Sequence, residues 1–142
     1  IMEFARTTRF PELQEKNLAF AHSRLGNLLA CAKELEKLRT FIARPVYITS
    51  GIRCPELNRA VGGAENSDHL NGDAVDFTVK DFQDPTGLRY IFDWCSYHLD
   101  YRQLIFEKPE GRKPWIHLGR DLGDGRPRQV LLFKGKGYEP YA

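Results

Sequence analysis

The sequence predicts an α+β fold: a single domain in which a small antiparallel sheet carries flanking helices. Two stretches with helical spacing of apolar residues support this prediction, one over residues 18–42 and one over residues 88–99. Short runs rich in β-branched and aromatic residues lie between and after them, and such runs are typical of strands. The 142 residues contain no repeats and no convincing linker, so one hydrophobic core is expected.

The first helical stretch follows a segment without periodicity. Residues 1–16 predict an irregular N-terminal arm, and residues 17–142 then form the single domain. Pro45 stops the helix, because proline cannot continue the backbone hydrogen bonds. The apolar positions that share one helical face are Leu25, Leu28, Leu29, Ala32, Leu35, Leu38 and Ile42.

Two further helices are predicted. Pro55, at a first helical position, starts a brief helix that ends at Ala60, before Gly62 and Gly63. The break at residues 85–87 precedes a longer amphipathic helix. Its apolar face consists of Leu88, Ile91, Phe92, Cys95 and Leu99.

Five short segments predict strands. They are residues 46–48, 74–79, 103–107, 115–119 and 129–134. Alternation in the second segment directs Val75, Phe77 and Val79 to the core and Asp76 to the opposite face. The same alternation in the fourth segment leaves His117 on the face opposite the core, so neighbouring strands can present Asp76 and His117 to one cleft.

The most concentrated chemistry lies in the segment Ser-Asp-His-Leu-Asn-Gly-Asp-Ala-Val-Asp, residues 67–76. His69 precedes a turn expected at Asn71–Gly72, and Asp76 follows within the strand. With His117 these side chains make the donor set of a zinc site that has three protein ligands, at roughly 2.0–2.2 Å, and one open position. An isolated histidine is more often an ordinary hydrogen-bonded residue, but an unpaired aspartate buried in a strand would be costly, and a metal removes that cost.

Other polar residues compete for these roles. His22 and His98 are rival ligands, but no partner pattern surrounds either, and we expect surface or capping residues. Asp68 and Asp73 flank the motif and are expected to be solvated or to accept a hydrogen bond from a histidine N–H.

The pattern Ser-x-His-x-x-Gly-x-Ala-x-Asp, followed by Trp-x-His, resembles the zinc D-Ala-D-Ala carboxypeptidases, the M15 peptidases, and in particular their short phage-associated members. The likeness covers roughly residues 40–119. It implies a hedgehog/DD-peptidase-like fold with one zinc ion on the sheet face, held by His69, Asp76 and His117. It also implies hydrolysis of peptidoglycan peptides at a D-alanine bond, by a carboxypeptidase or an endopeptidase of the endolysin type.

By the same resemblance, Arg53 and Ser67 contact the substrate carboxylate or carbonyl. A guanidinium suits bidentate capture of a terminal carboxylate, although Arg53 can instead pair with Glu56. Alternatively, the hydroxyl of Ser67 caps the local turn and does not contact the substrate.

One position departs from the family pattern. Relatives carry their catalytic glutamate three residues before the last histidine ligand, where this chain has Pro114, which cannot act as a base. Glu107 shares a strand face with Gln103 and Ile105 and is the expected base, if its strand pairs with residues 115–119. Glu107 can also be an ordinary strand-end acid.

Two other classes of protein therefore stay open. One is a catalytically inactive, zinc-containing phage structural or cell-wall-binding protein, which Pro114 favours. The other is an interaction domain with purely structural zinc, which a fourth protein ligand such as His98 would indicate.

Composition bounds the partners. A net charge of +2 is too small to indicate nucleic acid, and no apolar run approaches the roughly 20 residues of a membrane span. Three cysteines (Cys31, Cys54 and Cys95) without paired spacing indicate a reducing compartment, and Cys31 and Cys95, which fall within helical apolar patterns, are expected to be buried thiols. The N-terminal residues show no secretory hydrophobic segment, although a signal peptide could have preceded them. We expect a monomer whose partner is a peptidoglycan peptide. Its expected location is the bacterial cytoplasm or a phage-associated site, from which it acts on the cell wall.

Overall fold

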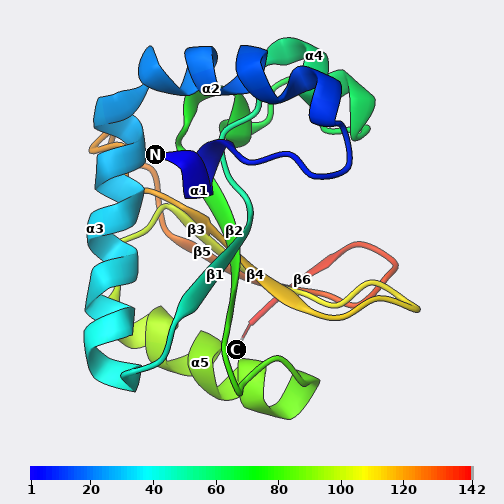
Figure 1. Cartoon of the computed structure of the whole chain (residues 1–142). Coiled ribbons are helices and arrows are strands. Elements are labelled where there is room, and N and C mark those ends of the chain that lie inside the picture. The colour runs from blue at the N-terminus through cyan, green and yellow to red at the C-terminus, as the bar shows by residue number, and fades with distance from the viewer. Residues whose placement is uncertain (142) are drawn as a thin grey trace.

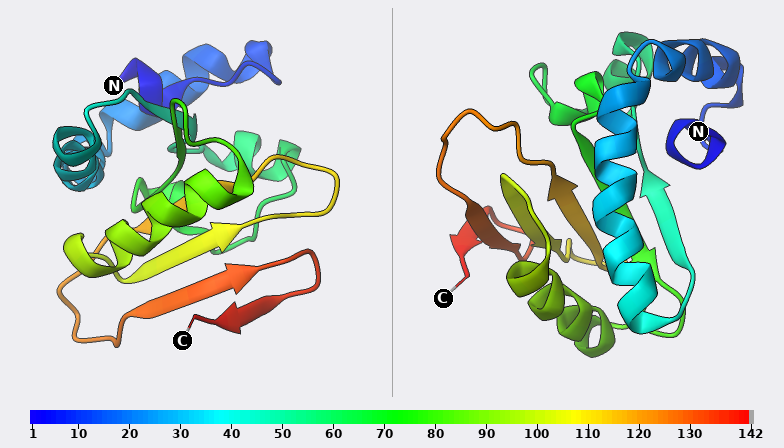
Figure 2. Two further views of the ribbon diagram at one scale, coloured as in Figure 1. Left: turned by 90° about the horizontal axis from the view of Figure 1, so that it is seen from below. Right: turned by 90° about the vertical axis from the view of Figure 1, so that its left-hand side faces the viewer.

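The computed structural model describes residues 1–141 and shows a mixed α+β single domain built on a six-stranded sheet (Figure 1). α3 and α5 pack on one face of the sheet, while α1, α2 and α4 gather at one end of the molecule (Figure 2). The elements in chain order are α1 (Met2–Ala5), η1 (Pro11–Leu13), α2 (Gln14–His22), α3 (Leu25–Ile42), β1 (Val46–Ser50), α4 (Pro55–Ala60), η2 (Asp68–Asn71), β2 (Ala74–Val79), α5 (Pro85–His98), β3 (Gln103–Glu107), β4 (Trp115–Gly119), β5 (Gln129–Phe133) and β6 (Tyr138–Pro140).

The sheet has the strand order β1-β2-β4-β3-β5-β6, and one of its pairs corrects the prediction of an antiparallel sheet. β5 runs parallel to β3, and the other four pairs are antiparallel. The reason is that β2 and β3 occupy both edges of β4, so the chain after Gly119 cannot turn back as a hairpin. It crosses the start of β3 instead, and Gln129 pairs beside Gln103. The exposed strand β6 was not predicted.

The strand alternation is confirmed. Val75, Phe77 and Val79 are fully buried in the main core, together with Ile116 and Leu118. The core side of α5 is buried at Leu88, Ile91, Phe92 and Cys95, as its spacing predicted. The opposite face of the sheet, which carries Asp76, His117 and Glu107 by strand parity, therefore remains for a site.

The first long helix is interrupted, which the apolar spacing did not reveal. α2 ends at His22 and α3 begins at Leu25. At the break the Ser23 hydroxyl donates a hydrogen bond to the Phe20 carbonyl at 2.6 Å, and Arg24 leaves helical geometry with φ −123° and ψ 24°. α3 then ends at Ile42, before Pro45 as predicted.

The expectation of an irregular N-terminal segment is wrong. It contains α1 and η1, and Ala5 is fully buried. Long-range hydrogen bonds, and not a repeat of apolar residues, fix this segment. The buried Asn17 amide donates to the carbonyls of Ala5 (2.9 Å) and Ile52 (3.0 Å), and its oxygen accepts from the Cys54 N–H (2.7 Å). The N-terminal segment is thereby fixed against the loop that follows β1.

Within residues 1–141, Cys31 and Cys95 are buried free thiols, as expected, and Cys54 is a buried free thiol as well. None of the helices in this part of the chain is both long and apolar enough to cross a membrane.

Candidate metal centre

His69 lies on a short, tightly hydrogen-bonded loop. The Ser67 hydroxyl accepts a hydrogen bond from the His69 N–H at 3.3 Å and caps η2. Gly72 ends η2 with φ 73°, a left-handed conformation that favours glycine. The turn predicted at Asn71–Gly72 is therefore present, and it leads the chain directly into β2.

Asp76 and His117 stand opposite each other on neighbouring strands. The register of β2 and β4 pairs Asp76 with His117, so both side chains leave the same face of the sheet. β3 pairs with β4 in turn, as the prediction for Glu107 required, and places Glu107 opposite Trp115. Strand parity thus predicted correctly that Asp76 and His117 share one face of the sheet.

The three expected ligands converge. His117 Nδ1 lies 2.8 Å and His69 Nε2 lies 3.4 Å from the same oxygen, Asp76 Oδ1. The ligand atoms of all three residues lie within 4.8 Å of one another, and this is the group found within residues 1–141 that can hold a metal ion. His69 and Asp76 are only 3% and 8% exposed, so these polar atoms are largely shielded from solvent.

A backbone carbonyl orients the His69 ring. Nδ1 of His69 lies 2.7 Å from the Gly51 carbonyl oxygen, which can only accept, so in the neutral ring Nδ1 carries the proton and Nε2 has the lone pair that can bind a metal ion. Gly51 itself lies against the N-terminal segment: a Cβ there would stand 2.0 Å from the Phe4 carbonyl oxygen. Sequence reasoning missed Gly51 because its partners are distant in the chain.

The donor set fits a zinc ion. Tetrahedral coordination at about 2.0–2.2 Å separates ligand atoms by roughly 3.3–3.6 Å. The 3.4 Å between His69 Nε2 and Asp76 Oδ1 matches that separation, and the 2.8 Å to His117 Nδ1 needs an opening of about 0.5 Å. Two imidazoles and one carboxylate leave a fourth position for water or substrate, as catalytic zinc sites do.

The Asp76 carboxyl is stabilised in its charged form. Burial alone would raise its pKa, but the charge and hydrogen bonds of His69 and His117 outweigh burial and hold the pKa of Asp76 below its ordinary value. The carboxylate therefore stays ionised at neutral pH, which a metal ligand must be.

The rival histidines stand outside this group. His98 donates from Nδ1 to the Trp94 carbonyl at 2.9 Å and stacks on the Trp94 ring with centroids 4.4 Å apart. His22 is exposed at the end of α2. Both match the expectation of surface or capping residues.

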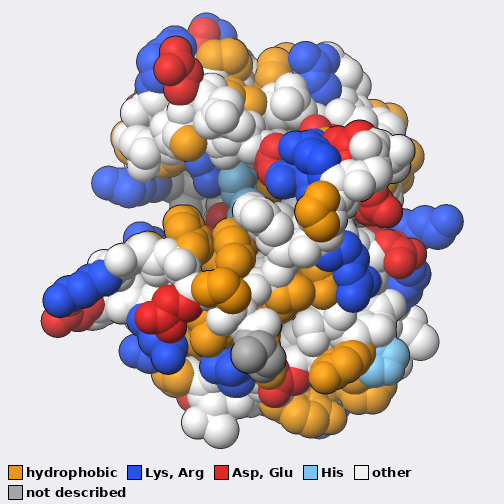
Figure 3. All heavy atoms as spheres, turned by 180° about the vertical axis from the view of Figure 1, so that it is seen from behind, with side chains coloured by type: hydrophobic (Ala, Val, Ile, Leu, Met, Phe, Trp, Pro, Cys, Tyr) orange, Lys and Arg blue, Asp and Glu red, His pale blue; other side chains and the backbone are white. Residues whose placement is uncertain are grey.

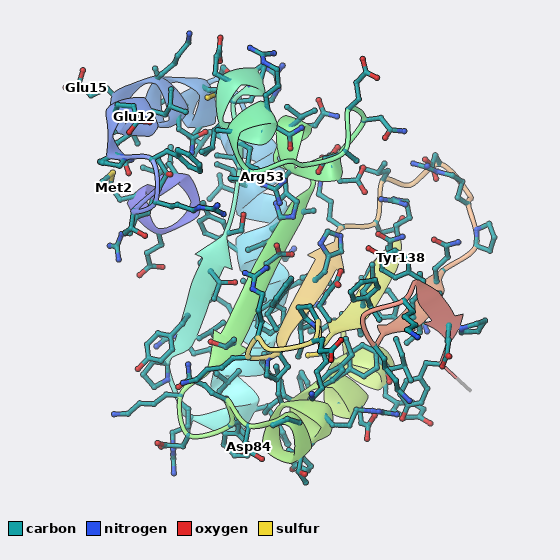
Figure 4. All side chains as sticks on the ribbon, turned by 90° about the vertical axis from the view of Figure 1, so that its right-hand side faces the viewer. Met2, Glu12, Glu15, Arg53, Asp84 and Tyr138 are labelled. Carbon is teal, nitrogen blue, oxygen red and sulfur yellow. The ribbon has the colours of Figure 1, made fainter. Side chains whose placement is uncertain are left out.

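Arg53 is held beside the site by neutral groups. Its guanidinium donates to Ser50 Oγ at 3.3 Å and to Asn58 Oδ1 at 3.0 Å. Burial lowers the pKa of Arg53, while the charge of Asp76 opposes that change. Pairing with Glu56 is not observed, because Glu56 binds Lys16 at 2.8 Å. In Figure 4 Arg53 lies beside α4, at the end of β1.

The acids that flank the motif have another role than expected. Asp68 pairs with Arg102, and Asp73 accepts a 2.8 Å hydrogen bond from Arg120 Nε. Asp68 is partly exposed and Asp73 is nearly buried, and neither forms a hydrogen bond to a histidine, because His69 uses the Gly51 carbonyl instead. These two ion pairs tie the His69 loop to the start of β3 and the end of β4.

Glu107 shares the sheet face with the metal-binding group. Burial raises the pKa of Glu107; the His117 charge opposes this rise and the Asp76 charge adds to it, so all three groups lie within electrostatic reach. Tyr138, which sequence reasoning missed, is the first residue of β6 (Figure 4), and its pKa is raised by burial and by the charges of Glu107 and Asp76. Pro114 is buried at the end of the β3–β4 loop.

A cleft of about 620 Å³ opens onto the site. Its walls come from residues 6–10 of the N-terminal segment, residues 49–53 around the end of β1, α4, and residues 112–115 of the β3–β4 loop. Arg53 and Asp76 line it, whereas the other proposed site residues do not: Ser67, His69, Glu107 and His117. Figure 3 shows a hollow on this side of the molecule, with histidine and acidic atoms at its floor and basic side chains beside it.

Comparison with known proteins identifies the family of the chain. A sequence model of the family described as peptidase M15 matches residues 9–103, more than half of the chain. The matched segment contains Arg53, Ser67, His69 and Asp76 and ends before Glu107 and His117. A search of proteins with curated descriptions gave no match. The chain belongs to the peptidase M15 family.

Proposed function

We propose that this protein is a zinc metallopeptidase that hydrolyses peptides of bacterial peptidoglycan at a D-alanine bond, as a DD-carboxypeptidase or as an endopeptidase of the endolysin type. Membership in the M15 family supports peptidase activity of this general kind. The observation that carries the proposal is the convergence of His69, Asp76 and His117, whose ligand atoms lie within 4.8 Å of one another beside an open cleft.

In this proposal one zinc ion is held by His69 through Nε2, by the Asp76 carboxylate and by His117 through Nδ1. When bound, zinc supplies Lewis-acid chemistry that polarises the scissile carbonyl and makes water a nucleophile near neutral pH. The Gly51 carbonyl holds the His69 ring in the tautomer that this requires.

Glu107 is the proposed base. Its carboxylate takes a proton from the attacking water and returns the proton to the leaving amine. Two observations support this role: Glu107 lies on the same sheet face as His117, and burial raises its pKa toward the range useful for proton transfer.

Arg53 and Ser67 are the proposed substrate contacts. The Arg53 guanidinium has no carboxylate partner within residues 1–141 and lines the cleft, so it can receive a substrate carboxylate. The Ser67 oxygen already accepts from the His69 N–H, and its hydrogen remains free to donate to a substrate carbonyl or carboxylate. We further propose a monomer, of bacterial or phage-associated origin, that does not bind nucleic acid.

A second function is favoured by one residue. Pro114 stands where relatives carry their glutamate, and this favours a catalytically inactive, zinc-containing phage structural or cell-wall-binding protein. A purely structural zinc is less well supported, because His98 is bonded to Trp94 and is not part of the metal-binding group.

A zinc-replete assay on purified cell-wall peptides, with mass spectrometry of the products, separates these functions. The enzyme should release defined fragments and lose activity after chelation. Zinc binding without any cleavage would favour the binding protein. The product masses also identify the bond that is cut, and thus carboxypeptidase or endopeptidase action.

A further inference from the structure

The walls of the cleft carry an excess of positive charge. Besides Arg53, it is lined by Arg6 and Arg9 of the N-terminal segment and by Arg112 and Lys113 of the β3–β4 loop. The single carboxylate among the lining residues is that of Asp76, which the proposed zinc would neutralise. The two pairs of cations come from segments that are far apart in the sequence, and both line the same cleft.

Within residues 1–141, these cations form no ion pair with an acidic side chain, although eight other lysine and arginine side chains do form such pairs. Arg112 instead lies over the Trp115 ring, 5.0 Å from its centroid, and Arg9 lies over Phe10 at 5.3 Å. Both contacts leave the guanidinium nitrogens free for a ligand.

Unpaired like charges around a concave surface favour an anionic ligand. They repel one another in the free protein, and a cleft focuses their field and attracts negative charge from solution. Arg53 can take one carboxylate, but its hydrogen bonds to Ser50 and Asn58 hold its guanidinium in one place. Arg6, Arg9, Arg112 and Lys113 are therefore available to bind a second anionic group of the ligand.

We propose that the cleft selects acidic peptides: a second substrate carboxylate, in addition to the one assigned to Arg53, is bound by Arg6 and Arg9 on one wall and by Arg112 and Lys113 on the other. This inference rests on the proposed peptidase function and names its substrate class. The N-terminal segment then acts as a specificity wall, which explains why Asn17 and Phe4 fix it so firmly beside the site.

The test uses two peptides that are identical except that one carboxylate near the cleaved bond is amidated in the second. The amidated group is not the terminal carboxylate assigned to Arg53. The variants are Arg6→Gln/Arg9→Gln and Arg112→Gln/Lys113→Gln. The control is Lys33→Gln/Lys80→Gln, which removes the same charge from exposed residues that do not line the cleft. For the parent, kcat/KM should favour the carboxylate peptide, and this preference should weaken with added salt.

Each cleft variant should lose roughly five- to tenfold of that preference, because partly exposed ion pairs are removed, whereas the control should keep it. Equal kcat/KM for the two peptides in the parent, or an unchanged preference in both cleft variants, would overturn the proposal. Fluorescence anisotropy with both labelled peptides on zinc-loaded protein distinguishes the two proposals. Tighter binding of the carboxylate peptide without cleavage would support the subsite and contradict the peptidase function.

Discussion

Asp76 Oδ1 and His117 Nδ1 lie 2.8 Å apart, on strands whose register places the two residues directly opposite each other. Their separation along the chain is 41 residues, and only the sheet brings them together. His69 reaches the same oxygen from a loop that the Gly51 carbonyl and the Ser67 hydroxyl hold in place. The metal-binding group is thus built by a rigid sheet and one braced loop.

The first prediction concerns this group. His117→Ala removes one of three donors and should reduce bound zinc strongly from about one ion per chain. Metal analysis after dialysis measures this loss. The control is His98→Ala, because His98 is bonded to Trp94 and stands outside the group, and it should leave zinc content unchanged. Full retention of zinc by His117→Ala would remove His117 from the ligand set.

The second prediction concerns Arg53. Arg53→Lys keeps the charge but loses the planar guanidinium, which donates to both Ser50 and Asn58. Cleavage of a peptide with a free terminal carboxylate should weaken by roughly tenfold or more, with zinc content unchanged. Kinetics on that peptide measure the effect. Parental kinetics in Arg53→Lys would contradict the carboxylate contact and favour endopeptidase action or no role for this residue.

The third prediction is a dependence of stability on pH. Cys31 is fully buried, and burial raises the pKa of its thiol from 9.0 to about 12. Because the folded state holds this proton more tightly than the unfolded state, the stabilisation is complete below pH 9.0 and is lost as the pH rises toward about 12. The free energy of unfolding should therefore fall by about 1.4 kcal/mol between about pH 7 and about pH 10 on account of this thiol.

Urea unfolding of the parent and of Cys31→Ala measures this contribution. The variant is less stable at every pH because it loses buried volume, but it lacks the thiol, so its stability should fall less steeply above about pH 9. Equal slopes for the two proteins would show that Cys31 titrates alike in both states.

Local patterns predicted much of the fold and the metal-binding group, for physical reasons. Alternation along β2 and β4 determines which residues face the core, so Asp76 and His117 could be placed on one face before their pairing was known. The bend at Ser23–Arg24 and the parallel pairing of β5 with β3 could not be predicted, because they depend on hydrogen bonds and strand edges that periodicity does not report.

The N-terminal wall of the cleft was missed for the same reason. Residues 6–10 show no pattern of their own and are positioned by distant groups, such as Asn17 and the Gln14 side chain, whose oxygen accepts from the Thr7 N–H at 2.8 Å. Asp68 and Asp73 were misjudged because their partners, Arg102 and Arg120, become neighbours only when β3 and β4 assemble.

The most direct test of the proposed metallopeptidase activity is to measure peptide hydrolysis by the Glu107→Gln variant. This change keeps the size and much of the hydrogen bonding of the side chain but removes the proposed base. Zinc content and folding should match the parent, because Glu107 is not among the ligands. Hydrolysis of a peptidoglycan peptide by the zinc-loaded variant, followed by mass spectrometry, should be slower by roughly 10²–10⁴-fold. Turnover near that of the parent would contradict the role of Glu107 as the base. Absence of turnover in the zinc-loaded parent itself would contradict the proposal that the protein is a zinc metallopeptidase.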